Sequence, residues 1–317
     1  MKLKKLVLVD LLLERIKFFE AISLKNYLPG QKFPSWIRVK SPGGENYNKL
    51  KSLMRKESLH TVCEEAHCPN IGECWESKSA TFMILGDICT RSCAYCAVKS
   101  GRPETLDLLE PLRLASTVKK IGLRYCVITS VNRDELPDGG AKIFGECVIR
   151  IRELSPECKV EILVPDFLGN EFALKTVINA KPDIFNHNIE TVPRIFRKVR
   201  PKGKYHRSLD VLKMVKELDN DIPTKSGIIL GMGETFEEVI HTLRDLRDVG
   251  CDLLTVGQYL QPSPTHVQLE KFYTPQEFES IKSIALEMGF VYVASGPLVR
   301  SSYHAEEQYE AMNKVRI

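Results

Sequence analysis

Short apolar runs alternate with helix-like segments through most of this 317-residue chain. The apolar runs are rich in Val, Ile, Leu and Phe, which is typical of buried parallel strands. They occupy residues 81–85, 125–130, 160–164, 183–188, 224–230, 253–256 and 291–294. Between them, apolar residues recur every three to four positions, which predicts amphipathic helices over 112–121, 143–154, 209–218 and 236–249.

This alternation predicts an α/β fold with a parallel sheet and right-handed crossovers. Six strand–helix units suit an open, partial (β/α)6 barrel of the TIM type better than a closed eightfold barrel. In such barrels the reacting groups lie at the C-terminal ends of the strands. Polar residues that follow the predicted strands are therefore the first candidates for a functional site.

The N-terminal part of the chain has a different pattern. Apolar residues at positions 3, 6, 7, 9, 13 and 16 predict an amphipathic helix, and charged residues interrupt the run too early for a secretion signal. Residues 25–50 contain several Pro and Gly, which predicts an extended, turn-rich arm. We expect an N-terminal extension (1–78), a barrel (79–295) and a C-terminal tail (296–317).

Composition narrows the class of protein. A formal net charge of +4 does not favour a nucleic-acid partner. No stretch approaches the ~18 apolar residues of a membrane helix, so we expect no membrane contact. The chain has ten cysteines and no convincing secretion signal, which indicates a reducing, cytoplasmic location and metal ligation instead of disulfides.

A compact cysteine motif follows the first predicted strand of the barrel. Cys89, Cys93 and Cys96 have the spacing C-x3-C-x2-C. Thiolates of this kind hold iron–sulfur clusters, and three of them leave one iron of a four-iron cluster open for another ligand. A structural zinc ion needs four protein ligands, and no fourth Cys or His lies close by in the sequence. The motif favours a cluster with an open iron over a zinc knuckle or packed core thiols.

A second cysteine motif lies just before that strand. Cys63, Cys68 and Cys74 have the spacing C-x4-C-x5-C, and Pro69 and Gly72 permit tight reversals between them. Zinc stays open here, because His60 or His67 could complete a tetrahedral site. The neighbouring motif favours a second cluster.

Three polar or charged segments are further candidates. Residues 130–134 and 138–140 follow the second strand, where an ordinary turn is the alternative to a ligand site. Residues 186–190 end the fourth strand with four polar side chains out of five, which is costly without a ligand or a hydrogen-bond network. Residues 194–207 contain eight basic and no acidic side chains, which indicates either an acidic partner or a solvated face.

Several blocks together resemble the lipoyl synthase family of radical S-adenosylmethionine (SAM) enzymes. They are residues 34–38, 63–75, 87–96, 129–140, 185–200, 224–235, 257–264 and 300–303. The resemblance implies a radical SAM barrel, two [4Fe–4S] clusters and SAM as cofactors, and a sulfurtransferase activity. That activity inserts two sulfur atoms at C6 and C8 of a protein-bound N6-octanoyl-lysine to give the lipoyl group.

The resemblance also implies roles for individual residues. The cluster that binds SAM is held by Cys89, Cys93 and Cys96. An auxiliary cluster, which supplies the sulfur, is held by Cys63, Cys68, Cys74 and Ser301, with Arg300 restraining its early release. A serine oxygen is a harder and more exchangeable ligand than a thiolate, which suits a cluster that must give up sulfide. The resemblance assigns this role to Ser301, and we expect Ser301 rather than Ser302 to be the fourth ligand. The expected SAM contacts are Tyr95, Asn132, Asn188 and Glu190.

The implied partners are proteins. The substrate would be an octanoylated lipoyl carrier domain or the glycine-cleavage H protein, and the basic stretch 194–207 would suit its acidic surface. The electrons would come from a donor such as ferredoxin or flavodoxin.

Three other functions compete with this interpretation. A radical SAM methylthiotransferase acting on tRNA also carries two clusters, but its N-terminal cysteines spread over a whole domain and an RNA-binding domain follows its barrel. A non-catalytic electron-transfer protein would need neither a barrel nor an open iron. A zinc-binding interaction module is the third alternative.

Overall fold

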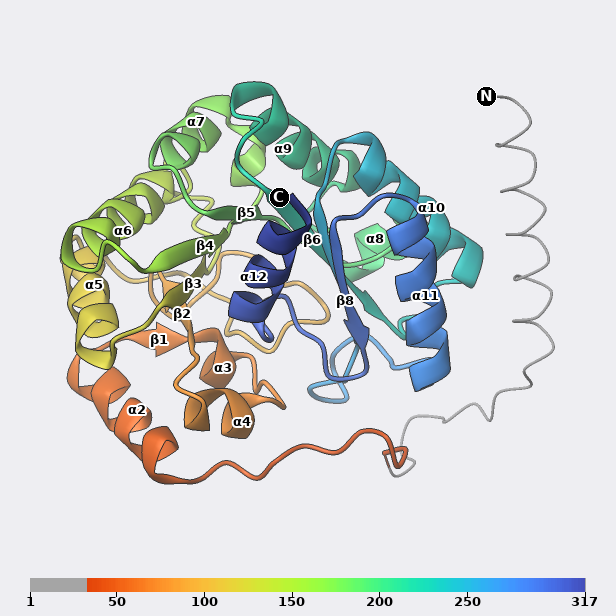
Figure 1. The fold of residues 1–317 in the computed structure, drawn as a ribbon, viewed down its shortest axis with the longest axis horizontal. Coiled ribbons are helices and arrows are strands. Elements are labelled where there is room, and N and C mark those ends of the chain that lie inside the picture. The colour runs from red at the N-terminus through yellow and green to blue at the C-terminus, as the bar shows by residue number, and fades with distance from the viewer. Residues whose placement is uncertain (1–32, 317) are drawn as a thin grey trace.

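The computed structural model describes residues 33–316, so the helix predicted near the N-terminus and residues 25–32 of the arm lie outside the described part. Figure 1 shows a curved sheet surrounded by helices. The eight strands of this sheet are paired in chain order from β1 to β8. A short β1 (His60–Thr61) is antiparallel to β2 (Thr81–Ile84), and every later pairing is parallel.

The remaining strands overlap the predicted apolar runs. They are β3 (Tyr125–Ser130), β4 (Lys159–Leu163), β5 (Ile184–Asn186), β6 (Thr224–Leu230), β7 (Leu253–Gln258) and β8 (Tyr292–Gly296). β5 covers only 3 residues of the predicted run 183–188. β2 and β7 are buried along their whole length. The helices that follow the strands are α5 (Glu110–Ile121), α6 (Ala141–Leu154), α7 (Glu171–Asn179), α8 (Pro193–Val199), α9 (Tyr205–Leu218), α10 (Phe236–Asp248) and α11 (Pro275–Glu287).

The α/β partial-barrel prediction is confirmed. β3 and β6 have the bounds that the apolar pattern predicts, and the late run at 291–294 becomes β8, parallel to β7. The sheet ends at β1 and β8, so the barrel is open along this seam. None of the helices among residues 33–316 combines the length and apolar character needed to cross a membrane.

The predicted arm is partly wrong. Residues 45–50 belong to helix α2 (Glu45–Lys56), which begins directly after Gly44. Leu50 and Met54 are buried on one face of this helix, and the Tyr47 ring packs on Trp75 at 5.1 Å between centroids. These contacts are tertiary, so the Pro and Gly content of the preceding segment did not indicate them.

One end of the barrel is closed by helix α12 (Ala305–Arg316), which lies over the middle of the ring in Figure 1. Its Met312 packs with Ile184 and Leu253, the first residues of β5 and β7. Its Tyr309 ring lies 5.7 Å from that of Tyr125, the first residue of β3. α12 therefore covers the end at which the strands begin, and the opposite end carries the candidate site.

Candidate active site

A cavity of about 560 Å³ lies at the C-terminal ends of the strands. It is lined by all of the site residues expected from the sequence: Cys63, Cys68, Cys74, Cys89, Cys93, Cys96, Tyr95, Asn132, Asn188, Glu190 and Ser301. Arg200, Arg300 and Ser302 also line it. The two cysteine motifs, which the sequence placed side by side along the chain, thus face a common space.

The first cysteine loop leaves β2 and closes on itself. The backbone N–H of Cys89 donates to the Lys99 carbonyl at 2.8 Å, and that of Gly101 donates to the Cys89 carbonyl at 2.9 Å. The Cys89 sulfur accepts from the backbone N–H groups of Arg91 at 3.4 Å and Asn132 at 3.3 Å. These two donors fix the orientation of the Cys89 sulfur in the loop.

Neighbouring loops hold this cysteine loop from both sides. The backbone of Ala94 donates to Val199 at 2.9 Å and accepts from Val267 at 2.7 Å. The His266 ring lies 3.0 Å, through Nε2, from the carbonyl oxygen of Cys96. The barrel therefore holds the cysteine loop through hydrogen bonds on both sides.

The thiols of the loop are strongly affected by burial. Burial raises the pKa of Cys96 to about 12 and also raises that of Cys93, for which the Arg200 charge opposes the shift. These thiols are protonated near neutral pH, so metal binding must release their protons.

Glu190 and Arg200 form the charged part of the cavity. Burial raises the pKa of the Glu190 carboxyl, and the Arg200 charge and hydrogen bonds from Asn188 and Tyr95 oppose that rise. Arg200 is buried, donates from its Nη1 to the Asn188 carbonyl at 3.0 Å, and leaves its Nε without a hydrogen-bond partner. Opposite charges side by side suit a zwitterion such as the amino-acid moiety of SAM.

Arg200 is a buried, cavity-lining residue that the sequence analysis did not single out. The pattern placed it in the basic stretch 194–207, as part of a surface for an acidic partner. Its position could have distinguished Arg200 from the other basic residues of the stretch. It lies between Val199, which is fully buried, and Pro201, where the helical pattern ends.

The basic stretch is not one continuous free surface. Arg194 pairs with Glu238 at 2.6 Å, Arg207 pairs with Asp166 at 3.3 Å, and the Lys202 ammonium donates to the Thr90 carbonyl at 2.7 Å. Arg194 and Lys202 remain exposed in these pairings. The other exposed basic side chains of the stretch are Arg197, Lys198, Lys204 and His206.

The second cysteine motif folds into two short helices. Cys63 lies in α3 (Val62–Glu65), Cys74 lies in α4 (Ile71–Glu76), and the backbone of Cys68 donates to the Cys63 carbonyl at 3.0 Å between them. Burial raises the pKa of both Cys63 and Cys74 to about 12, and the charges of the neighbouring thiols add to both shifts. The three thiols therefore lie near one another.

A zinc ion and a four-iron cluster require different spacings of their ligands. Zinc needs ligands about 2.0–2.3 Å from one point, whereas the thiolates around a four-iron cluster are spread over its surface. Among residues 33–316, no three His, Cys, Asp or Glu side chains converge tightly enough to bind a single metal ion.

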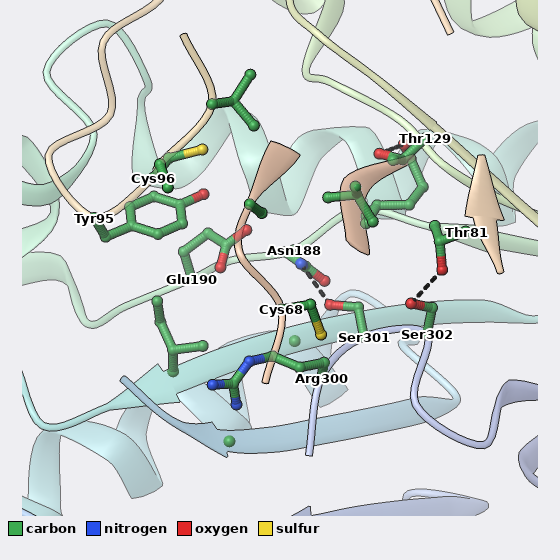
Figure 2. Close-up of a pocket in the computed structure, with 18 of the residues that line it drawn as sticks. Cys68, Thr81, Tyr95, Cys96, Thr129, Asn188, Glu190, Arg300, Ser301 and Ser302 are labelled. Atoms are coloured by element: carbon green, nitrogen blue, oxygen red, sulfur yellow. Dashed lines mark hydrogen bonds between the residues drawn. The ribbon is translucent and has the colours of Figure 1, made fainter. Parts of the chain in front are cut away.

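The C-terminal segment 298–304 reaches both parts of the cavity. Ser301 Oγ accepts from Asn188 Nδ2 at 2.7 Å, and Ser302 Oγ accepts from the Thr81 hydroxyl at 2.6 Å (Figure 2). Arg300 lies beside Cys68, whose charge opposes the lowering of the Arg300 pKa by burial. Composition alone did not single out this segment, because its partners lie more than 100 residues away in the chain.

Comparison with known proteins identifies the family. The model of the radical SAM superfamily matches residues 83–246, and that of the N-terminal domain of lipoyl synthase matches residues 15–68. The chain is 60% identical over 277 residues to a lipoyl synthase of Rubrobacter xylanophilus, covering 87% of this chain and 86% of that one. It is 53% identical to a lipoyl synthase of Koribacter versatilis, covering 90% of this chain and 94% of that one.

Solved structures agree on the fold. Methylornithine synthase superimposes with a TM-score of 0.51 at 14% identity, covering 74% of this chain and 80% of that one. Streptococcus suis SuiB bound to S-adenosylmethionine superimposes with a TM-score of 0.52 at 12% identity, covering 88% of this chain and 57% of that one. At this identity the likeness supports the barrel and no more.

The relatives also decide between the competing functions. These relatives are named lipoyl synthases, and the match covers nearly their whole length. This excludes the tRNA methylthiotransferase, electron-carrier and zinc-module alternatives. Membership implies two [4Fe–4S] clusters and SAM as cofactors. The chain belongs to the lipoyl synthase family of the radical SAM superfamily.

Proposed function

We propose that this enzyme inserts its two sulfur atoms at C6 and C8 of an octanoyl-lysine that enters the cavity between the two cysteine motifs. The single observation that supports this proposal is that both motifs, the Glu190–Arg200 pair and Ser301 line one cavity. An octanoyl chain in this space would lie against both groups of thiols at once.

The residues present fit the first cluster and SAM. Cys89, Cys93 and Cys96 supply three thiolates, and the buried Asn132 Oδ1 and Arg200 Nε lack partners within the protein. Such buried, unpaired polar atoms beside a cavity call for a ligand. We assign Arg200 to the carboxylate of SAM, Glu190 to its ammonium group, and Tyr95, Asn132 and Asn188 to further contacts around it.

The residues present also fit the auxiliary cluster. Cys63, Cys68 and Cys74 supply three thiolates, and Ser301 Oγ is the fourth candidate. Each serine oxygen accepts one hydrogen bond, Ser301 from Asn188 and Ser302 from Thr81, so the choice of Ser301 follows the family resemblance. Arg300, beside Cys68, would balance the negative charge of the thiolates.

When bound, the first cluster and SAM supply a radical that removes hydrogen from the octanoyl chain, and the auxiliary cluster supplies sulfur. The protein has three tasks around that chemistry: it aligns the alkyl chain, orders the cysteine loops and excludes water.

The exposed basic residues near the cavity would bind a partner protein. The exposed side chains of Arg197, Lys198 and Lys204 lie beside the first cysteine loop, which α8 contacts through Val199, and would receive an acidic lipoyl carrier domain or glycine-cleavage H protein. A ferredoxin or flavodoxin would supply electrons. Free thiolate ligands require a reducing compartment, which supports a cytoplasmic location.

We assign the three parts of the chain to three tasks. Residues 1–78 carry the auxiliary thiols, residues 79–295 form the barrel that holds SAM, and residues 296–317 bring the serine ligand and close the barrel.

The proposed function is tested by anaerobic reconstitution with iron, sulfide, SAM and a reductant, followed by mass spectrometry of an octanoylated carrier peptide. We expect a mass gain of two sulfur atoms, less two hydrogens when the two thiols close into a ring. A Cys63→Ala enzyme should cleave SAM and add no sulfur. Sulfur addition by that variant would overturn the proposal.

A further inference from the structure

Asn188 lies between two halves of the cavity. The auxiliary side is lined by Cys63, Cys68, Cys74 and Ser301, and the SAM side is lined by Glu190 and Arg200. Its side chain donates to Ser301 Oγ at 2.7 Å on the auxiliary side, and on the SAM side it lies near enough to Glu190 to oppose the rise of the Glu190 pKa. Figure 2 shows the Asn188 amide between the Glu190 carboxyl and the two serines. One carboxamide thus lies between residues of the two halves.

The backbone around Asn188 fixes its position. Arg200 holds the Asn188 carbonyl at 3.0 Å, and Glu190 has a left-handed φ of 69° while its N–H donates to Gly227 at 2.9 Å. A non-glycine residue in that region is strained and persists only where its surroundings impose it. The segment therefore has little freedom to move without disturbing Asn188.

Gly227 on β6 provides the space that the amide needs. A Cβ at Gly227 would lie 2.7 Å from Asn188 Oδ1 and 2.7 Å from Thr255 Oγ1. The φ of Gly227 is not in the left-handed region, so the absent side chain matters for space alone. Asn188 Oδ1 is buried there and has no hydrogen-bond partner within the protein.

The neighbouring serine provides a built-in comparison. Ser302 is held by Thr81, which begins β2, and not by a residue of the SAM side. Of the two adjacent serines, Ser301 is the one tied to the segment that carries Glu190.

We propose that Asn188 is a positioning residue that holds Ser301 in its liganding orientation and couples it to occupancy of the SAM site. A donor at 2.7 Å makes the Ser301 oxygen an acceptor and leaves its second lone pair for another partner in the cavity that the auxiliary thiols also line. A ligand that engages Glu190 or the free Asn188 oxygen shifts the amide, and with it the support of Ser301. This inference rests on the proposed function, in which Ser301 is an auxiliary ligand.

The first test measures how fast a chelator removes auxiliary iron from the full chain. Cys89, Cys93 and Cys96 are replaced by Ala so that the auxiliary cluster alone is present. We expect Asn188→Ala to speed iron loss about fivefold to tenfold, the amount one net hydrogen bond supports. Ser301→Ala should do the same, the double variant should be no faster than Ser301→Ala, and Gly227→Ala, which displaces the amide, should follow Asn188→Ala.

The matched control is Thr81→Val, which removes the hydrogen bond to Ser302 and keeps the side-chain shape. It should change the rate by less than about twofold, since the loss falls on the serine that is not a ligand. An Asn188→Ala rate equal to the parent rate, with Ser301→Ala fast, would overturn the inference and leave the ligand set intact. Parent-like rates for Ser301→Ala would overturn the ligand set and the inference together.

The second test measures SAM affinity in the enzyme with both clusters. Coupling between two sites is reciprocal, so Ser301→Ala should change the SAM dissociation constant about threefold when Asn188 is present and not in the Asn188→Ala background. Equal effects of Ser301→Ala in both backgrounds would contradict the coupling.

Discussion

Arg91, in the first cysteine loop, donates to Asp166 at 2.6 Å, and both side chains are almost fully buried. A second carboxylate, Asp134, accepts from Arg91 at 2.8 Å but is partly exposed. Arg91 lies between two of the cysteines, so carboxylates from the loops after β3 and β4 fix the loop that carries the thiols. Burial would raise the pKa of the Asp166 carboxyl, but the hydrogen bond and charge of Arg91 hold it well below its usual range.

Removing the charge of either carboxylate partner of Arg91 should lower the stability of the fold by a different amount. Asp166→Asn leaves part of the Arg91 charge buried and uncompensated, so we expect a loss of about 3–5 kcal/mol in the free energy of unfolding. Asp134→Asn should cost about 1 kcal/mol or less, because water can replace that partner. Urea unfolding and the iron content after reconstitution check both variants; equal losses would contradict the assignment of the buried pair.

His187 predicts a pH dependence of stability. Burial, with a contribution from the Arg200 charge, lowers its pKa to about 4, and its ring is 2.8 Å from the Val164 carbonyl and 3.0 Å from Ser208 Oγ. The unfolded chain takes up this proton near pH 6.5, before the folded protein does, so stability falls with decreasing pH from about 6.5 toward 4.

Between pH 7 and 5 this group alone should remove about 2 kcal/mol of stability. A His187→Gln enzyme should lack that component, so its unfolding free energy should change less over the same range. Parallel profiles for the two proteins would show that His187 is not the titrating group.

The two serines of the tail predict different spectra. Ser301→Ala should change the Mössbauer spectrum of the auxiliary cluster and abolish sulfur insertion, because its oxygen is the proposed fourth ligand. Ser302→Ala should lose one hydrogen bond, about 1 kcal/mol of stability, and keep the spectrum. The reverse result would exchange the two assignments.

The surface of α8 predicts a salt-dependent interaction. Arg197→Glu with Lys198→Glu should weaken carrier binding about tenfold at low salt and spare SAM cleavage, since both side chains are exposed. Arg200 is unsuitable for this test, although the sequence grouped it with them, because it is buried beside Glu190. Lys119→Glu with Lys142→Glu, at exposed sites on α5 and α6, reverses the same amount of charge elsewhere and should leave binding unchanged. An equal loss of carrier binding in both double variants would show that the exposed basic residues of α8 are an ordinary solvated face.

The sequence predicted the features that depend on local pattern. β3 and β6 were found by their apolar runs, and the two cysteine motifs by their spacing, because a run or a motif contains its own signal. It could not predict contacts that the fold alone creates. Three examples are the burial of Arg200, the Asn188–Ser301 hydrogen bond and the packing of α2 on Trp75. In each case the contacting segments are separated along the chain, so no local pattern indicates that they meet.

The central claim is that a cluster held by the auxiliary thiols would supply the sulfur within the shared cavity. The most direct measurement is a single turnover of enzyme reconstituted with isotopically heavy sulfide, freed of excess sulfide, and mixed with octanoylated carrier, SAM, reductant and ordinary sulfide. We predict that both sulfur atoms of the product are heavy in the parent enzyme and that the Cys63→Ala enzyme makes no product. A product that contains ordinary sulfur from solution would contradict the account.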